Sequence, residues 1–273
     1  MVSCGAAYHT CAMSKDIYIH GTEPSEQERL AGLNRMTNAA FIRFLNVAPG
    51  TRVLEVGSGL GLLANEVAVS AADVDVDGVE VSAAQLAAAR PAPRVTFTQG
   101  DAHALDFPDA SFDLVYARYL LEHVAEPERV LREMRRVARP GGRVAVCEND
   151  ISLLRFDPPC PAFERAWDTF ITFQTSLGGD GLIGRRLFRL FRQAGFSDIE
   201  LSVQPEIHWH RSPGYGAWLH NIIGNLESAR RGLLEARLIT ERDLDEGVND
   251  LERLKARDDG SSVFVWNRAM ARR

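Results

Sequence analysis

The spacing of apolar residues changes repeatedly between residues 50 and 150, and each change marks an expected element of secondary structure. Short continuous apolar runs predict buried strands, because a strand that is covered on both faces needs no polar side. Apolar residues that recur every third or fourth position predict amphipathic helices. The expected strands are residues 53–56, 77–82, 94–99, 112–118 and 142–148, and the expected helices between them are 60–68, 83–90 and 127–138.

This alternation of strand and helix predicts an α/β fold in which helices cover both faces of a parallel sheet. A further helix is expected upstream, at residues 25–45. The rhythm changes after Glu148, because prolines interrupt the chain between residues 157 and 161. Beyond them we expect helices near 163–176 and 183–194, a strand at 197–210, a mostly helical stretch and a closing strand at 261–270.

The segment VLEVGSGLG places Gly57, Gly59 and Gly61 where the first strand turns into the first helix of this alternation. Such a turn directs backbone N–H groups and the positive end of a helix toward a ligand at the carboxyl edge of the sheet. The dinucleotide fingerprint G-x-G-x-x-G requires a glycine where this chain has Leu62. Glu55 precedes the turn and suits an ammonium group better than a pyrophosphate. A tight turn without a ligand is the alternative interpretation.

Two further acids follow expected strands. Glu80 ends the second strand, where a carboxylate can accept hydrogen bonds from both hydroxyls of a ribose. Asp101 follows the third strand and is placed to bind the exocyclic amine of an adenine. A ligand that combines an ammonium group, a ribose and an adenine is S-adenosylmethionine. The alternative roles are a helix cap or surface acid for Glu80 and a turn cap for Asp101.

Four segments together resemble the class I S-adenosylmethionine-dependent methyltransferases: VLEVGSGLG, GVEVS, QGDAHALDFPDASFDLVYARYLLEHV and EMRRVARPGGRVAV. The nearest branch is the group of small-molecule enzymes similar to the ubiquinone and menaquinone C-methyltransferases. The resemblance covers residues 51–148, and the remainder matches only in general plan. It implies a doubly wound seven-stranded sheet of order 3-2-1-4-5-7-6 with an antiparallel last strand. Residues 197–210 and 261–270 would be the sixth and seventh strands.

The resemblance also implies a division of the chain and a set of cofactor contacts. Residues 1–22 would form an N-terminal arm or lid, 23–148 the S-adenosylmethionine-binding core, and 149–273 the rest of the sheet. Helical insertions at about 157–195 and 211–259 would cap the substrate site. The implied cofactor-binding residues are Glu55, Gly57, Ser58, Gly59, Glu80, Val81, Asp101, Ala102 and Arg118. The family often has a small or polar residue at the position of Arg118.

Aromatic stripes at helical spacing, such as Trp167 with Phe170, are usually core but fall in segments that cap this fold. The candidate substrate-binding residues are Tyr119, His123, Trp167, Phe170, His208, His210, Tyr215 and Trp218. His123 and Tyr18 are candidates for a general base or an orienting group, with a buried structural histidine and a disordered arm as the alternatives. His208 and His210 share a strand face, but no third ligand is evident, so we expect no metal site.

Composition excludes several other classes. The formal net charge of −6 without a long basic run argues against nucleic acid as a partner. No apolar run is long enough for a membrane span, and the first twelve residues lack the features of a signal peptide. The four cysteines have no C-x-x-C spacing, so we expect free thiols and a cytoplasmic protein.

The predicted function is therefore methyl transfer from S-adenosylmethionine to a small apolar or aromatic molecule, with a natural-product tailoring role suggested by the Ala/Arg-rich composition. Whether oxygen, nitrogen or carbon is methylated stays open. The alternatives are a nicotinamide-dependent oxidoreductase and a non-catalytic, methyltransferase-like binding subunit. A homo-oligomer formed through the N-terminal arm or the helical insertions also stays open.

Overall fold

A computed structural model of the chain describes residues 24–273. The helices are α1 (Pro24–Leu45), α2 (Leu62–Ala68), α3 (Ala83–Ala88), α4 (Pro127–Val137), α5 (Pro161–Ser176), α6 (Leu187–Gln193), α7 (Tyr215–Glu235) and α8 (Glu241–Ala256). Three short 3₁₀ helices are η1 (Leu121–His123), η2 (Ile151–Leu153) and η3 (Ile183–Arg186). The strands are β1 (Arg52–Val56), β2 (Asp75–Glu80), β3 (Val95–Gln99), β4 (Phe112–Arg118), β5 (Ala138–Glu148), β6 (Arg155–Asp157), β7 (Ile199–Trp209) and β8 (Ser261–Arg272).

The strands form one sheet in which β3, β2, β1, β4 and β5 run parallel, followed by β8. Strand β8 is antiparallel to β5 on one side and to β7 on the other. The predicted sixth and seventh strands are β7 and β8, so the predicted fold class and strand order are confirmed. The short strand β6 was not predicted; it lies just before Pro158 and pairs antiparallel with residues 261–263 at the start of β8.

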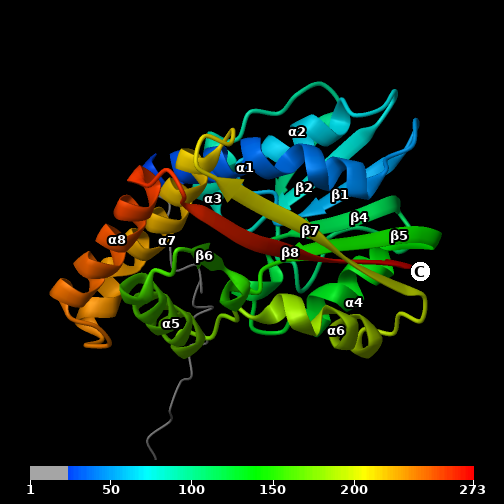
Figure 1. The fold of residues 1–273 in the computed structure, drawn as a ribbon. Helices are drawn as coiled ribbons and strands as arrows, with labels where there is room; N and C mark the ends of the chain where they lie inside the picture. Colours follow the sequence, from blue (N-terminus) through cyan, green and yellow to red (C-terminus); the bar gives the residue numbers. More distant parts are fainter. Residues whose placement is uncertain (1–23) are drawn as a thin grey trace, which may run out of the picture.

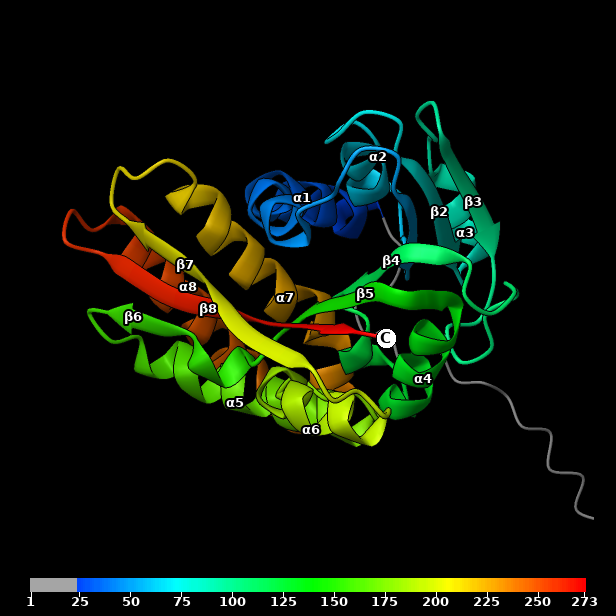
Figure 2. The same cartoon turned by 90° about the vertical axis from the view of Figure 1, so that its right-hand side faces the viewer.

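Helices cover both faces of the sheet, as Figures 1 and 2 show, with α1 and α2 on one face and α4 and α6 on the other. The neighbouring residues Val53 and Leu54 of β1 are both fully buried, and they belong to two different apolar clusters on opposite faces. Helix α4 buries the predicted stripe that includes Val130 and Met134. The chain enters β5 at Ala138, earlier than the predicted start at residue 142, and the ladder to β4 is irregular there.

Helices α5, α7 and α8 form a group at one end of the molecule (Figure 1). Helix α5 packs against α7 and α8, and α7 also packs against α1. The start of β8 passes beside this group, with Phe264 and Trp266 buried in the same apolar cluster as the helices. Helix α6, in contrast, packs against α4 on the opposite face. Helix α7 therefore lies on the face of the sheet that α1 covers, and α6 lies on the face that α4 covers.

Two further observations concern the described residues only. Cys147 and Cys160 are buried free thiols. Among residues 24–273, no helix combines the length and the apolar character needed to cross a membrane.

Candidate functional site

A cavity of about 480 Å³ lies at the carboxyl ends of β1, β2 and β4, a size typical of small-molecule sites. It has two ends of different character. The lining residues of the glycine end are Glu55, Gly57, Ser58, Gly59, Glu80 and Val81. The aromatic lining residues of the other end, called the aromatic end below, are Tyr119, Trp167, Phe170, Trp218, Phe264 and Trp266.

The glycine turn, residues 57–61, is a backbone structure that other residues cannot easily adopt. Gly57, Gly59 and Gly61 have φ of 77°, 54° and 73°, in the left-handed region that L-residues disfavour. The N–H groups of Gly57 and Ser58 both donate to the carbonyl of Val79, at 2.8 and 2.9 Å, and so fix the turn against β2. A Cβ on Gly61 would overlap the ring of Phe97 on β3. The glycines therefore serve both the turn and the close approach of the backbone to β3.

Glu80 connects the glycine turn to the start of α3. Its two carboxylate oxygens accept from the N–H of Gly59 and the N–H of Ser82, each at 2.9 Å. The side chain is buried yet lines the cavity. Because a carboxylate offers about four lone-pair positions, Glu80 can still accept hydrogen bonds from a ligand. Val81 beside it is 55% exposed at the rim of the cavity.

Glu55 brings a buried carboxyl group to the wall of the same end. Its Oε2 atom is buried and has no hydrogen-bond partner among the described residues. Burial raises the pKa of Glu55 to about 8, against the opposing effect of the Arg118 charge. A buried, unpaired carboxyl oxygen is costly, so a ligand that brings an ammonium group to this point would relieve the cost.

Arg118 lies between the two ends and ties α1 to β4. Its guanidinium donates to Asn34 Oδ1 at 2.6 Å, Asn38 Oδ1 at 2.7 Å and Thr37 Oγ1 at 3.1 Å. These three acceptors are neutral groups of α1. It also lies over the ring of Tyr119, with 5.1 Å to the centroid. The positive charge of Arg118 therefore faces the cavity without a hydrogen-bonded carboxylate from the described part of the chain.

The aromatic end is built by rings from α5, α7 and β8. Trp167 and Phe170 are stacked with centroids 5.0 Å apart, and the Trp167 indole N–H donates to the carbonyl of Ile151 at 2.9 Å. Tyr119 and Trp266 form a second ring pair in the lining, with centroids 4.8 Å apart. Such rings present flat apolar walls, which suit the apolar or planar part of a small molecule.

Comparison with known proteins identifies the class of this site. Residues 54–146 match a family described as a methyltransferase domain. The O-methyltransferase cnsE of Penicillium expansum is 33% identical over 213 residues, which cover 72% of this chain and 73% of the relative. The chain belongs to the class I S-adenosylmethionine-dependent methyltransferases.

Other relatives of this chain match shorter stretches. The ubiquinone/menaquinone biosynthesis C-methyltransferase UbiE of Ectopseudomonas mendocina is 34% identical over 147 residues, covering 51% of this chain and 55% of the relative. The chain spans 48%, 64% and 58% of the length of the first three curated relatives that it matches. A putative methyltransferase structure from Anabaena variabilis has a TM-score of 0.59 at 18% identity and covers 87% of this chain and 96% of its own, which shows a shared fold.

S-adenosylmethionine is the cofactor of this class, and the glycine end of the methyltransferase fits it. The buried Oε2 of Glu55 has no partner of its own among the described residues, and Glu80 retains lone pairs for a ribose. The absence of side chains on Gly57 and Gly59 leaves the backbone of the turn open to the cavity. Of the predicted cofactor-binding residues, the structure gathers seven around the cavity: Glu55, Gly57, Ser58, Gly59, Glu80, Val81 and Arg118.

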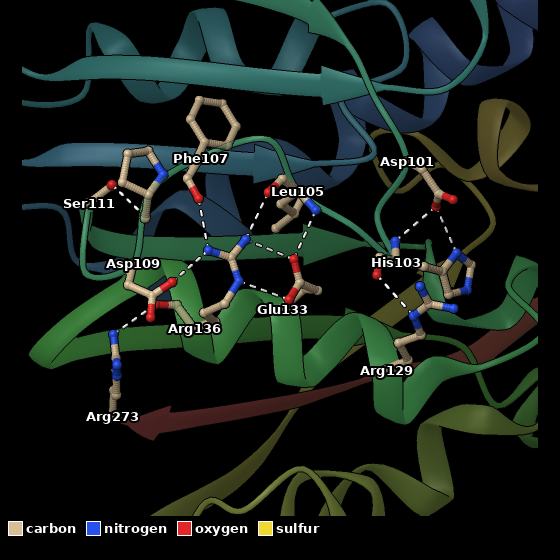
Figure 3. Close-up of polar contacts among 11 residues, drawn as sticks. Asp101, His103, Leu105, Phe107, Asp109, Ser111, Arg129, Glu133, Arg136 and Arg273 are labelled. Carbon is tan, nitrogen blue, oxygen red and sulfur yellow. Dashed lines mark hydrogen bonds and ion pairs between the residues drawn. The ribbon is translucent and has the colours of Figure 1, made fainter.

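Asp101 and Ala102 lie outside the lining of the cavity, so an adenine contact by these residues stays a prediction. The Asp101 carboxylate accepts from the backbone N–H of His103 at 2.8 Å and lies 2.8 Å from its ring Nδ1 (Figure 3). Helix α4 holds the following loop, because Arg129 donates to the His103 carbonyl and Arg136 donates to the carbonyls of Leu105 and Phe107. The Asp101 carboxylate therefore already has hydrogen-bond partners within its own loop, as expected of a turn cap.

The predicted substrate residues divide into two groups. Five line the cavity: Tyr119, His123, Trp167, Phe170 and Trp218. The other three, His208, His210 and Tyr215, lie outside its lining. His208 Nε2 is 2.6 Å from a Glu206 oxygen and its ring stacks on Trp218, whereas the Tyr215 hydroxyl donates to the Leu254 carbonyl. Of these three residues, His208 therefore contacts a lining residue of the aromatic end, Trp218.

The remaining predictions concern the candidate general bases and a metal site. Tyr18 lies outside the described residues, and His123 lines the cavity as a candidate orienting group or base. Over residues 24–273, no group of three or more potential metal-ligating side chains is close enough to hold a metal ion.

Sequence reasoning missed the polar side chains of the aromatic end. Glu122, Asn149 and Gln174 line the cavity, as do Asn221 and Asn225 of α7. A signal was present in Gln174, which lies seven residues after Trp167 and therefore on the same face of a helix. A polar residue within an otherwise aromatic, buried stripe indicates a hydrogen-bonding partner in the interior.

Proposed function

We propose that this chain is an enzyme that transfers the methyl group of S-adenosylmethionine to a small apolar or aromatic molecule. The observation that carries the proposal is the continuity of one cavity, which joins the acids and glycine turn of one end to the aromatic walls of the other. A methyl donor at the glycine end and an acceptor at the aromatic end would therefore meet in a shared enclosure.

In this proposal the residues of the chain bind and orient rather than react. Glu55 binds the ammonium group, Glu80 the ribose, and Arg118 an anionic part of the cofactor such as its carboxylate. The cofactor supplies an activated methyl group on a sulfonium. The walls formed by Trp167 and Trp266 hold the acceptor in line with that methyl group and exclude water, which is the main contribution that positioning makes to such a displacement.

The nature of the acceptor is supported by the walls and by one relative. The rings of the aromatic end favour a planar, apolar acceptor. The relative cnsE is an O-methyltransferase, and its match extends well beyond the methyltransferase domain, which supports an oxygen acceptor. His123 and Tyr18 remain the candidate bases. The oxidoreductase alternative is disfavoured because Leu62 replaces the required glycine and because Glu55 faces the turn.

Ligand-dependent thermal unfolding tests the proposal. S-adenosylhomocysteine should raise the melting temperature, since a ligand that binds only the folded state stabilises it by about 2.7 kcal/mol at a hundred times its dissociation constant. NAD serves as the matched control and should give no shift. A shift with NAD and none with S-adenosylhomocysteine would show that the cofactor assignment is wrong.

A further inference from the structure

A buried carboxylate lies at the junction of η1, β5 and α5, within the aromatic end. Glu122 accepts at Oε1 from the side-chain amide of Asn149, at 2.5 Å, and at Oε2 from that of Gln174, at 3.2 Å. All three side chains line the cavity. Because each amide gives its N–H to Glu122, the carboxylate is held in a fixed orientation from both sides.

Within the described chain, no arginine or lysine forms an ion pair with Glu122. The Nε2 atom of His123 lies 3.7 Å from Glu122 Oε1, within ion-pair range but beyond hydrogen-bond distance. Glu122 is only 5% exposed. A buried carboxylate needs several hydrogen bonds, and the two amides fill about half of its lone-pair positions. The carboxylate therefore has acceptor capacity left at the cavity wall.

The amides beside Glu122 add to this surplus of acceptors. Asn149 Oδ1 and Gln174 Oε1 are buried and have no hydrogen-bond partner among residues 24–273. Buried acceptors without donors are rare in folded proteins, and a ligand donor is one way to satisfy them. This part of the wall is thus matched to a group that donates hydrogen bonds.

Glu148 supports the same turn but does not share this role. Its Oε1 accepts from the N–H groups of Leu120 and Leu121, at 3.0 and 2.8 Å, and so fixes η1, which carries Glu122. Burial, and then the negative charge of Glu122, raise the pKa of Glu148 to about 8. Glu148 does not line the cavity. Glu148 is therefore a positioning group outside the cavity and provides a matched control for Glu122.

We propose that Glu122 selects acceptors in which a hydroxyl or amine is attached to a planar apolar body, by accepting the hydrogen bond of that group. The planar body would lie against the rings of the aromatic end, such as Trp167 and Phe170. This inference rests on the proposed function, because it takes the aromatic end to be the acceptor's binding site.

Matched fragments test the inference without knowledge of the natural acceptor. Phenol, benzylamine and toluene share one ring and differ in the donor group, and each is titrated calorimetrically into the protein with and without S-adenosylhomocysteine. Phenol or benzylamine should bind about ten to a hundred times more tightly than toluene, the range for a hydrogen bond to a charged group. The stronger of the two identifies a hydroxyl or an ammonium as the preferred donor.

Two variants test whether Glu122 is responsible for the preference over toluene. Glu122→Gln should reduce the preference over toluene by about tenfold, because hydrogen bonds to a neutral acceptor are weaker. Glu148→Gln keeps a side-chain oxygen that can accept from the N–H groups of Leu120 and Leu121, so it should retain the preference. S-adenosylhomocysteine should bind both variants as it binds the parent protein, and thermal unfolding checks that both fold.

Equal binding of the three fragments, binding of none, or a preference that survives Glu122→Gln would each overturn the inference. These outcomes differ from a failure of the proposed function, in which S-adenosylhomocysteine itself would not bind the parent protein.

Discussion

At the glycine end of the cavity the wall includes a tight backbone turn at residues 57–61, whereas the aromatic end is lined by aromatic and polar residues from several elements. The glycine turn and Glu80 are joined by backbone N–H groups, and both lie at the ends of the adjacent strands β1 and β2. The aromatic end brings together η1, α5, α7 and β8, which are far apart in the sequence. One end is thus fixed by local conformation and the other by tertiary packing.

This difference explains how the two ends can change independently. A backbone turn tolerates few substitutions, because its glycines adopt conformations that other residues disfavour. A wall of side chains can exchange one ring or one polar group for another while the helices stay in place. We therefore expect the cofactor to be fixed by the fold and the acceptor to be chosen by residues such as Glu122 and Trp167.

The largest expected effect concerns the charge of Glu55. Its pKa rises from 4.5 to about 8 on folding, chiefly through burial, so the folded protein binds more protons than the unfolded chain between these values. The contribution of this group to stability is therefore lost as pH rises from about 4.5 through about 8, by on the order of 5 kcal/mol. Glu55→Gln should match the parent near pH 5 and be more stable above pH 8, as measured by urea unfolding.

The control for this prediction is Glu235→Gln, which changes an exposed acid of α7 and should produce no such pH-dependent gain. S-adenosylhomocysteine should reverse the order of stability at high pH, because its ammonium group pairs with the ionised Glu55 but not with a glutamine. Equal pH profiles of the parent and Glu55→Gln would contradict the burial argument.

The second effect tests how rigid the glycine end is. Gly61 and Gly50 both have φ of 73°, but a Cβ would overlap the Phe97 ring only at Gly61, and at Gly50 it would meet nothing within 4 Å. Gly50→Ala should cost about 1–2 kcal/mol of unfolding free energy for the backbone conformation alone. Gly61→Ala should cost about 1–3 kcal/mol more through overpacking. Similar losses in the two variants would mean that Phe97 moves aside without cost.

The sequence reveals the glycine end because its determinants are local or follow from strand ends. Gly57, Glu55 and Glu80 come from adjacent parallel strands, whose carboxyl ends must meet at one edge of the sheet. Asp101 shows the limit of this reasoning, because His103, two residues downstream, already binds its carboxylate. Short polar side chains often prefer such local partners, and strand order alone does not predict the competition.

The aromatic end is only partly visible in the sequence. Helical spacing correctly brings Trp167 and Phe170 to one buried face, but it does not distinguish a core from a cavity wall. The contact between Glu122 and Gln174 spans 52 positions and depends on how α5 docks beside η1. No periodicity or motif encodes such packing, so the polar side chains of the aromatic end emerge only from the folded structure.

The smallest expected effect asks whether the two ends are energetically separate. Trp167→Phe keeps a ring at the aromatic end but removes the indole N–H that donates to the buried Ile151 carbonyl. The loss of one such hydrogen bond should lower the free energy of unfolding by about 1 kcal/mol. Trp209→Phe, at an exposed position of β7, is the matched control and should change the free energy of unfolding by less than about 0.5 kcal/mol.

The affinity for S-adenosylhomocysteine should stay within about twofold of the parent in both variants, because Trp167 shares no hydrogen-bond partner with Glu55 or Glu80 in the described chain. A loss of about tenfold in Trp167→Phe, equivalent to about 1.4 kcal/mol, would show that packing at the aromatic end is transmitted to the glycine turn.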